Sequence, residues 1–238
     1  MGKNVLIIGA SGDIGIAIAK RLAEAGYHLI LHYNKNKEAI TAFRETVDKE
    51  CILTVHQADL SSEAETKKLL LQLTLPVDHI VFASGSAHFG LFQDTTEQMM
   101  NDMLGLHVKA PWMITKYLLS RMIRQQSGNI VFITSIWGEQ GASNEVIYSS
   151  VKGAQNSFVK ALAKEVAPSG ISVNAVSPGY MDTKMNNHLE EQDKQAILNE
   201  IPMKRSGKPS EVAHAVYFLL ESKSNYIQGE IINMTGGW

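Results

Sequence analysis

Short apolar runs alternate with segments of helical periodicity along the whole chain, and this constrains the fold more than any other feature. The first run, Val5–Ile8, is followed by a helical segment from Asp13 to Ala25. The other runs are Leu29–Leu31, Ile52–Val55, His79–Phe82, Ile130–Ile133, Ile171–Val176 and Glu230–Asn233. Most of these runs are apolar throughout, which is typical of parallel strands covered on both faces. The pattern predicts an α/β fold: a single doubly wound Rossmann-type domain with a seven-stranded parallel sheet and helices on both faces.

The composition limits what such a domain can bind. No Pro/Gly/Ser linker, repeat or charge block divides the 238 residues, so one domain spanning 1–238 is expected. The formal net charge of −2 and the lack of a basic run argue against a nucleic-acid partner. A single cysteine, Cys51, excludes an intrachain disulfide, and we expect no metal site. No apolar run approaches the ~20 residues that span a bilayer, so we expect a soluble, cytoplasmic protein.

A glycine-rich turn follows the first apolar run and leads into a helix. Glycines let the backbone approach a pyrophosphate closely, and the helix N-terminus offers free N–H groups. A purely structural turn between strand and helix is the alternative, since the spacing alone is weakly specific. The residues expected to contact a dinucleotide here are Gly9, Ser11, Gly12, Asp13, Ile14 and Gly15.

Two later positions support a dinucleotide site. Asp59-Leu60 follows the third run, where a carboxylate can accept a hydrogen bond from an adenine amine, although Asp59 could also be a helix N-cap. Gly85 closes the fourth run, where only a small residue lets a cofactor pass along the carboxyl edge of the sheet.

A tyrosine, a lysine and a serine form the candidate catalytic group. Tyr-x-x-x-Lys occurs at Tyr33/Lys37, Tyr148/Lys152 and Tyr180/Lys184. Residues four apart share a face only within a helix, and only the second pair opens a long helical segment, residues 149–167. Ser135 ends the fifth run, so its hydroxyl and that of Tyr148 can converge at the carboxyl edge of the sheet.

This group suits carbonyl reduction by hydride. An ammonium at ~4–6 Å favours the ionised form of a phenol, so we expect Lys152 to lower the pKa of Tyr148 by roughly 1–3 units. Tyr148 would donate a proton to the forming alkoxide, and Ser135 would hold the carbonyl oxygen.

With these residues in place, the chain resembles the classical short-chain dehydrogenase/reductase family over essentially its whole length. The matching stretches are 9–15, Asp59-Leu60, Ser135, Tyr148/Lys152, 173–179 and 229–237. Within the family, 201–205 and the glycine-rich tail are most similar to the 3-oxoacyl-acyl-carrier-protein reductase type. The resemblance implies that Pro178, Gly179 and Met181 line the nicotinamide, with Thr183 near its carboxamide or the phosphates. It also implies a homotetramer that uses the apolar helix in 99–123, the Tyr148 helix and the glycine-rich tail.

The chain departs from the family pattern at three places. Asp13 stands where the turn usually carries glycine, which puts the phosphate contacts in question. The family's Asn-Asn-Ala-Gly reads Phe82-Ala83-Ser84-Gly85; Ala83 and Ser84 are still expected to contact the cofactor, but the asparagine bonds must be replaced. His107 aligns with the family's fourth catalytic residue, an asparagine. His107 is either a helix histidine with a structural hydrogen bond or a residue that positions a relay water beside Lys152.

The end of the second run favours NADPH over NADH. A carboxylate there would bind the ribose hydroxyls and repel a phosphate, but the chain has Asn34 and Lys35 instead, followed by Lys37. The alternative is that these lysines are ordinary solvated surface.

The substrate is only weakly encoded; a small-molecule or carrier-protein-linked ketone is expected. A carboxylate at Glu145 could attract a cationic substrate. The stretches Ile136-Trp137-Gly138 and Ser143-Asn144-Glu145-Val146 also resemble the branch that reduces the 5-aminopentanone modification on elongation factor P. A non-catalytic NADP-binding sensor or scaffold is the alternative of another class.

The segment 179–202 is less regular and is a candidate flap. The expected pocket residues are Ile136, Trp137, Gln140, Glu145, Tyr180 and Met185.

Overall fold

The computed structural model describes residues 3–187 and 189–238, which form one parallel sheet between two helical layers. The strands run in the spatial order β3-β2-β1-β4-β5-β6-β7, and every neighbouring pair is parallel. Their bounds are Asn4–Ile8 (β1), His28–Tyr33 (β2), Ile52–Gln57 (β3), His79–Phe82 (β4), Gly128–Ile133 (β5), Ile171–Pro178 (β6) and Ile231–Met234 (β7). The predicted fold class is therefore confirmed.

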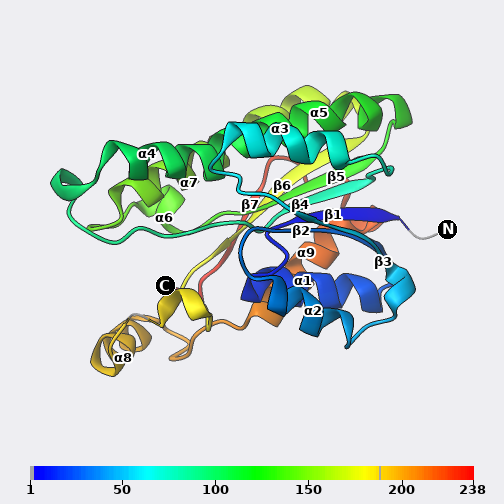
Figure 1. Ribbon diagram of the computed structural model, residues 1–238. Helices are drawn as coiled ribbons and strands as arrows, with labels where there is room; N and C mark the ends of the chain where they lie inside the picture. Colours follow the sequence, from blue (N-terminus) through cyan, green and yellow to red (C-terminus); the bar gives the residue numbers. More distant parts are fainter. Residues whose placement is uncertain (1–2, 188) are drawn as a thin grey trace.

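The helices cover both faces of this sheet (Figure 1). α3, α4, α5 and α7 lie on one side, and α1, α2 and α9 lie on the other. The helices are Asp13–Glu24 (α1), Lys37–Arg44 (α2), Glu63–Gln72 (α3), Glu97–Leu104 (α4), Ala110–Gln125 (α5), Trp137–Gln140 (α6), Val146–Val166 (α7), Glu191–Glu200 (α8) and Pro209–Leu220 (α9).

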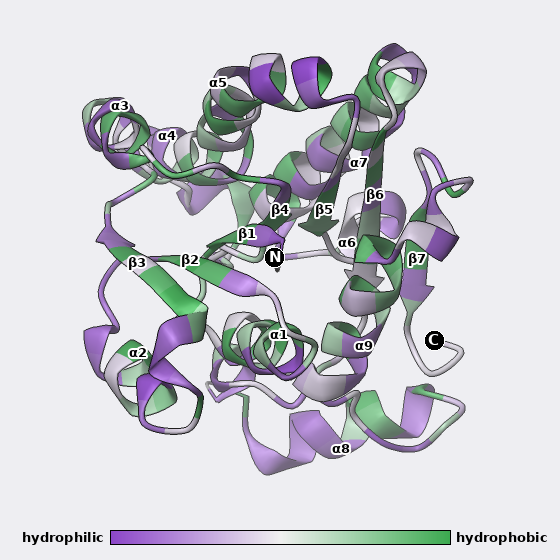
Figure 2. Ribbon diagram, turned by 90° about the vertical axis from the view of Figure 1, so that its right-hand side faces the viewer, coloured by the Kyte–Doolittle hydropathy of each residue, from purple (hydrophilic) through white to green (hydrophobic). Residues whose placement is uncertain are grey.

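The core consists of two apolar layers, one on each face of the sheet. Along β1, Leu6 and Ile8 face the α3, α5 and α7 layer, whereas Val5 and Ile7 face α1 and α9. All four side chains are fully buried, which is why this run shows no alternation in the sequence. Figure 2 shows the apolar strands between the helical layers, with the polar α8 at the periphery; α8 has no buried residue.

The predicted boundaries shift at several elements. The seventh strand begins at Ile231 rather than Glu230, and α7 begins at Val146, so Tyr148 lies within its first turn. The candidate flap contains the 3₁₀ turn Lys184–Asn186 and the helix α8. Residues 1–2 of the expected domain and residue 188 of the expected flap lie outside the described residues.

The apolar segment 99–123 is not one regular helix. α4 ends at Leu104, a π turn spans Gly105–Lys109, and α5 follows from Ala110. In this turn the Ala110 N–H donates to the Gly105 carbonyl five residues earlier. Pro111 lacks an N–H and its ring crowds the carbonyl four residues before it, so the regular α-helical pattern cannot pass this point.

Within the described parts of the chain, the helices are all too short or too polar to cross a bilayer.

Candidate active site

The carboxyl ends of β1, β4, β5 and β6 meet along one edge of the sheet, and most of the predicted site residues follow these ends. Gly9 follows β1, Ala83 follows β4, Ser135 comes two residues after β5, and Gly179 follows β6. Parallel pairing aligns these ends, so residues far apart in the sequence share one surface.

The glycine-rich turn after β1 is fixed by close backbone packing. Gly9 has a φ of +83°, and a Cβ on it would lie 2.5 Å from the Ser84 backbone. A Cβ on Gly15 would lie 2.2 Å from the Gly9 carbonyl oxygen. A larger residue at Gly9 would push the turn away from the segment after β4, and one at Gly15 would push the first turn of α1 away from the turn, so both glycines are needed for this shape.

His32 holds the same turn from β2. The Gly9 N–H donates to its Nδ1 at 3.2 Å, and its Nε2 lies 3.0 Å from the Ala58 carbonyl oxygen. Burial lowers the pKa of His32 to about 4, against the opposing effect of the Ala58 carbonyl. The ring is therefore neutral near pH 7, with Nε2 donating to Ala58 and Nδ1 accepting from Gly9.

The N-terminus of α1 faces the candidate flap. Gly12 is its N-cap and provides no side-chain cap, so the first-turn N–H groups stay available to an anion. The Asp13 carboxylate accepts the backbone N–H of Lys184 at 2.7 Å. Asp13 thus connects the glycine-rich turn to the segment that follows Thr183.

The ends of β2 and β3 form the far part of the edge, around Asp59. The Asp59 carboxylate accepts from the Ser61 N–H at 3.0 Å and the Ser61 hydroxyl at 2.8 Å. Burial raises the pKa of Asp59, but Ser61, Lys35 and Asn34 lower it, and the net shift is downward. Asn34 and Lys35 therefore lie beside Asp59; their contacts with a cofactor remain predictions.

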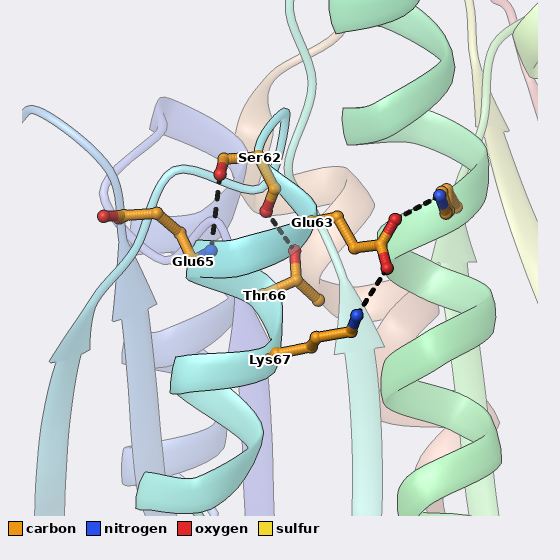
Figure 3. Close-up of polar contacts among 6 residues, drawn as sticks. Ser62, Glu63, Glu65, Thr66 and Lys67 are labelled. Carbon is orange, nitrogen blue, oxygen red and sulfur yellow. Dashed lines mark hydrogen bonds and ion pairs between the residues drawn. The ribbon is translucent and has the colours of Figure 1, made fainter.

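The start of α3 connects this region to the π turn (Figure 3). Ser62 caps α3 by accepting the Glu65 N–H at 3.3 Å, and its carbonyl accepts the Thr66 hydroxyl at 3.0 Å. Glu63 pairs with Lys67 at 2.7 Å and also with Lys109, the last residue of the π turn. These ion pairs are largely exposed, so they orient the two elements more than they stabilise the fold.

Tyr148, Lys152 and Ser135 come together at the centre of the edge. All three are buried, with exposed fractions of 8%, 3% and 8% respectively. Lys152 Nζ lies 5.6 Å from the centre of the Tyr148 ring and donates to the Ile133 carbonyl, at the end of β5, at 2.9 Å. The Ser135 hydroxyl oxygen accepts the Trp137 N–H at 3.3 Å. The sequence prediction that these three side chains converge agrees with their positions.

The predicted lowering of the pKa of Tyr148 is wrong for the protein alone. Burial raises the pKa of Tyr148 to about 12; a hydrogen bond with Ser135 opposes this rise and Glu145 adds to it. Burial also lowers the pKa of Lys152 to about 7, which reduces the ammonium population that can favour the ionised phenol in the protein alone. Tyr148 therefore remains protonated near pH 7, which is the state a proton donor needs.

His107 lies beside these groups without bonding to Lys152 through its ring. The ring stands edge-on to Tyr148 with centres 5.9 Å apart, and Nε2 lies 3.0 Å from the Ser86 carbonyl oxygen. Burial first, and then Lys152, lower the pKa of His107 to about 3, so the ring is neutral at neutral pH. The Nδ1 atom is buried and has no hydrogen-bond partner in the described structure. A relay role for His107 remains a prediction.

Gly85 leaves space between the histidine and the lysine. A Cβ at Gly85 would lie 3.2 Å from His107 Cε1 and 3.9 Å from Lys152 Nζ. Because a side chain here would enter the space in front of both groups, glycine keeps the edge open beside Lys152. The passage of a cofactor along this edge stays a prediction.

The predicted pocket residues surround this centre unevenly. Ile136 is buried, and its N–H donates to the Pro178 carbonyl at 3.2 Å, which joins the segments after β5 and β6. Trp137 packs edge-on against Trp238 with ring centres 5.2 Å apart. Gln140 ends α6, Glu145 is the N-cap of α7, and Tyr180 accepts the Gly207 N–H through its carbonyl. Met181 pairs with Gly207, and Met185 is exposed in the 3₁₀ turn after Thr183.

Sequence reasoning missed Gln155, which contacts the catalytic lysine. Lys152 Nζ donates to Gln155 Oε1 at 3.2 Å, and Gln155 Nε2 donates to the His107 carbonyl at 2.8 Å. The signal was available, because residue 155 is three positions after Lys152 and seven after Tyr148 and so lies on the same face of α7.

Comparison with known proteins agrees with this geometry. A family model described as enoyl-(acyl carrier protein) reductase matches residues 9–238. The chain belongs to the short-chain dehydrogenase/reductase family. It is an NAD(P)H-dependent oxidoreductase of the type that acts on alcohols and ketones.

Relatives with similar sequences cover the chain from end to end. It is 49% identical over 240 residues to the uncharacterized oxidoreductase YmfI of Bacillus subtilis, covering 100% of this chain and 99% of that one. It is 35% identical over 240 residues to the 3-oxoacyl-[acyl-carrier-protein] reductase FabG of Aquifex aeolicus, covering 99% and 97%. A solved 3-oxoacyl (acyl-carrier-protein) reductase from Agrobacterium tumefaciens with NADP bound has a TM-score of 0.90 at 26% identity, covering 100% and 94%.

The contact between Asp13 and Lys184 yields a prediction about the flap. In Asp13→Ala the Lys184 N–H loses its acceptor, and we expect its hydrogen exchange to accelerate about fivefold, since such a bond contributes ~1 kcal/mol. Asp13→Asn keeps an acceptor oxygen and should change the rate less. Exchange measured by NMR or mass spectrometry at pH 7 checks this; an unchanged rate in Asp13→Ala would show that the carboxylate does not restrain the flap.

Proposed function

We propose that the protein is an NADPH-dependent carbonyl reductase of the 3-oxoacyl-carrier-protein reductase type, with Tyr148 as the proton donor. The observation that carries this proposal is the convergence of Tyr148, Lys152 and Ser135 in one buried group at the carboxyl edge of the sheet. A cofactor-binding module without chemistry needs none of these three side chains.

Each side chain has a distinct role in the proposed reaction. The Ser135 hydroxyl donates to the substrate carbonyl oxygen and holds it beside Tyr148. Tyr148, protonated at neutral pH, passes its proton to that oxygen as the carbonyl carbon is reduced. The Lys152 ammonium, 5.6 Å from the centre of the Tyr148 ring, stabilises the phenolate that remains.

The described residues fit a nicotinamide dinucleotide, which supplies hydride when bound. The uncapped N-terminus of α1 suits its pyrophosphate, and Gly85 leaves room beside Lys152 for the nicotinamide. The end of β2 carries Asn34 and Lys35 without a carboxylate, which favours the extra phosphate of NADPH. The bound NADP of the Agrobacterium reductase supports the same assignment. The residues proposed to hold the dinucleotide are those predicted from the sequence around the glycine-rich turn, Asn34, Asp59, Gly85, Tyr148 and the segment 178–183.

Replacing Tyr148 tests the proton-transfer step. We expect Tyr148→Phe to lower kcat/KM for ketone reduction by roughly 10²- to 10⁴-fold, because it removes the general acid. Binding of NADPH should be retained. The measurement is loss of NADPH absorbance with an acetoacetyl carrier and with a generic activated ketone.

Tyr27→Phe is the matched control, because Tyr27 packs on His79 at the opposite edge of the sheet and should leave activity unchanged. Activity of Tyr148→Phe close to that of the wild type would refute the assignment of Tyr148. Tight NADPH binding with no turnover of any ketone by the wild type would instead favour the non-catalytic sensor or scaffold.

A second candidate substrate is a ketone that carries a positive charge, as in the 5-aminopentanone modification on elongation factor P. The supporting observation is that the Glu145 carboxylate raises the pKa of Tyr148, so its charge acts at the reacting hydroxyl. A cation placed near this hydroxyl would be attracted by the same field.

Glu145→Gln separates the two substrates. For a ketone ending in an ammonium group we expect KM to rise about fivefold, because a favourable charge interaction is lost. A neutral ketone of the same length serves as control and should keep its KM. In a deletion strain, intact-mass analysis of elongation factor P should find the unreduced ketone adduct; its absence would exclude this substrate.

We also propose that the chain assembles as a homotetramer through α5 and α7. Between these helices lies a groove of about 440 Å³. Trp112 and Ile123 on α5 are exposed by 48% and 39%, which is unusual for large apolar side chains on a helix with a buried opposite face. The apolar residues lining the groove are Trp112, Leu119, Ile123, Phe158 and Leu162.

Light scattering tests this assembly. The wild type should have the mass of a tetramer, and Ile123→Glu should give smaller species, because the charge would have to be buried in the interface. Leu71→Glu, on the exposed side of α3, is the control and should leave the mass unchanged. A stable wild-type monomer would contradict the proposal.

A further inference from the structure

The amide of Gln155 connects the catalytic lysine to the backbone of the π turn. Its Oε1 accepts from Lys152 Nζ at 3.2 Å, and its Nε2 donates to the His107 carbonyl at 2.8 Å. The side chain is buried, with 4% of its surface exposed, so bulk water does not compete for these bonds. The link therefore consists entirely of protein atoms.

The His107 carbonyl is available because of Pro111. In a regular α-helix the carbonyl of residue 107 would accept the N–H of residue 111. Residue 111 is a proline and has no N–H, so the carbonyl needs another donor. A buried carbonyl without a donor is costly, and Gln155 supplies one from α7.

The two partners fix the orientation of the amide. A carbonyl can only accept and an ammonium can only donate, so Nε2 must face His107 and Oε1 must face Lys152. A leucine of similar size could satisfy neither partner. A glutamate could accept from Lys152 but, when ionised, would place an oxygen against the His107 carbonyl.

We infer that Gln155 is a positioning residue that holds the Lys152 side chain, in its ammonium form, against the carboxyl end of β5. The inference rests on the proposed function, since it concerns the lysine of that reaction. Two of the three donors on Nζ go to the Ile133 carbonyl and to Gln155. The third is left for the side of Tyr148 and Gly85.

The surroundings of Lys152 leave few other groups to stabilise its charge. Its titratable neighbours are Tyr148 from α7 and His107 from the π turn, and both are neutral near pH 7. None of the ion pairs among the described residues includes Lys152. The charge therefore depends on two neutral acceptors, the Ile133 carbonyl and Gln155 Oε1, and burial already lowers the pKa of Lys152 to about 7.

The experiment measures the pKa of Lys152 by NMR and then compares it with the pH profile of turnover. NMR of the full-length protein labelled with ¹³C-lysine follows the Lys152 Cε signal against pH in the wild type, Gln155→Leu and Gln155→Glu. We expect Gln155→Leu to lower the pKa of Lys152 by about one unit, because a hydrogen bond to the charged form is lost. Gln155→Glu should raise it, since a carboxylate favours the ammonium.

The pH profile of turnover should follow this change. The pH at which activity is lost on the alkaline side should shift in the same direction as the pKa of Lys152 and by a similar amount. Gln228→Leu is the matched control, because Gln228 also connects backbone groups, donating to Ile171 and accepting from Val173, but far from Lys152. It should leave both the signal and the pH profile unchanged.

An unchanged pKa of Lys152 in both Gln155 variants, or a fall in kcat that is equal at every pH, would overturn the inference. If Gln155→Leu does not fold, the expected rise of the Lys152 pKa in Gln155→Glu tests the inference instead. The NMR titration needs no substrate, so a shift of Lys152 in a protein that reduces no ketone would contradict the proposed function and leave the role of Gln155 standing.

Discussion

The burial of the Lys152 amine at the carboxyl edge of the sheet is the constraint on which the site depends. An ammonium removed from water is costly unless hydrogen bonds replace its hydration. Here the replacements are neutral, one from the end of β5 and one from Gln155. Without a carboxylate partner, the charge of Lys152 is set by a balance between burial and dipoles. Burial lowers the pKa of Lys152 to about 7, so the groups around the amine affect its charge at neutral pH.

The π turn places these groups relative to one another. Pro111 interrupts the helical pattern, and the extra residue in the turn brings the His107 carbonyl to Gln155 and the His107 ring to Tyr148. Gly105 lets the π turn pack against the loop that follows β3, since a Cβ at this position would lie 2.5 Å from the Ser61 carbonyl oxygen. The region of Asp59 and the region of Tyr148 are therefore parts of one connected structure.

Much of this arrangement follows from the sequence because it depends on local periodicity. Largely buried strands such as β1, β5 and β6 read mainly as apolar runs, and a spacing of four places Tyr148 and Lys152 on one face of α7. What could not be predicted depends on contacts between distant segments. Asp13 reaches Lys184, His32 holds Gly9, and Gln155 reaches His107, and no pattern in the sequence pairs these residues. The direction of the pKa shift of Tyr148 was mispredicted for the same reason: burial, a property of the whole fold, outweighs the lysine beside it.

The most direct test of the account is a crystal structure of the protein with NADPH bound. The account requires the nicotinamide to lie along the carboxyl edge beside Gly85, with the Tyr148 hydroxyl and Lys152 Nζ facing it within hydrogen-bonding reach of the cofactor, about 3 Å. It also requires the Gln155 amide to remain between Lys152 and the His107 carbonyl. A dinucleotide bound elsewhere, or a Tyr148 hydroxyl and Lys152 amine turned away from the nicotinamide, would contradict it.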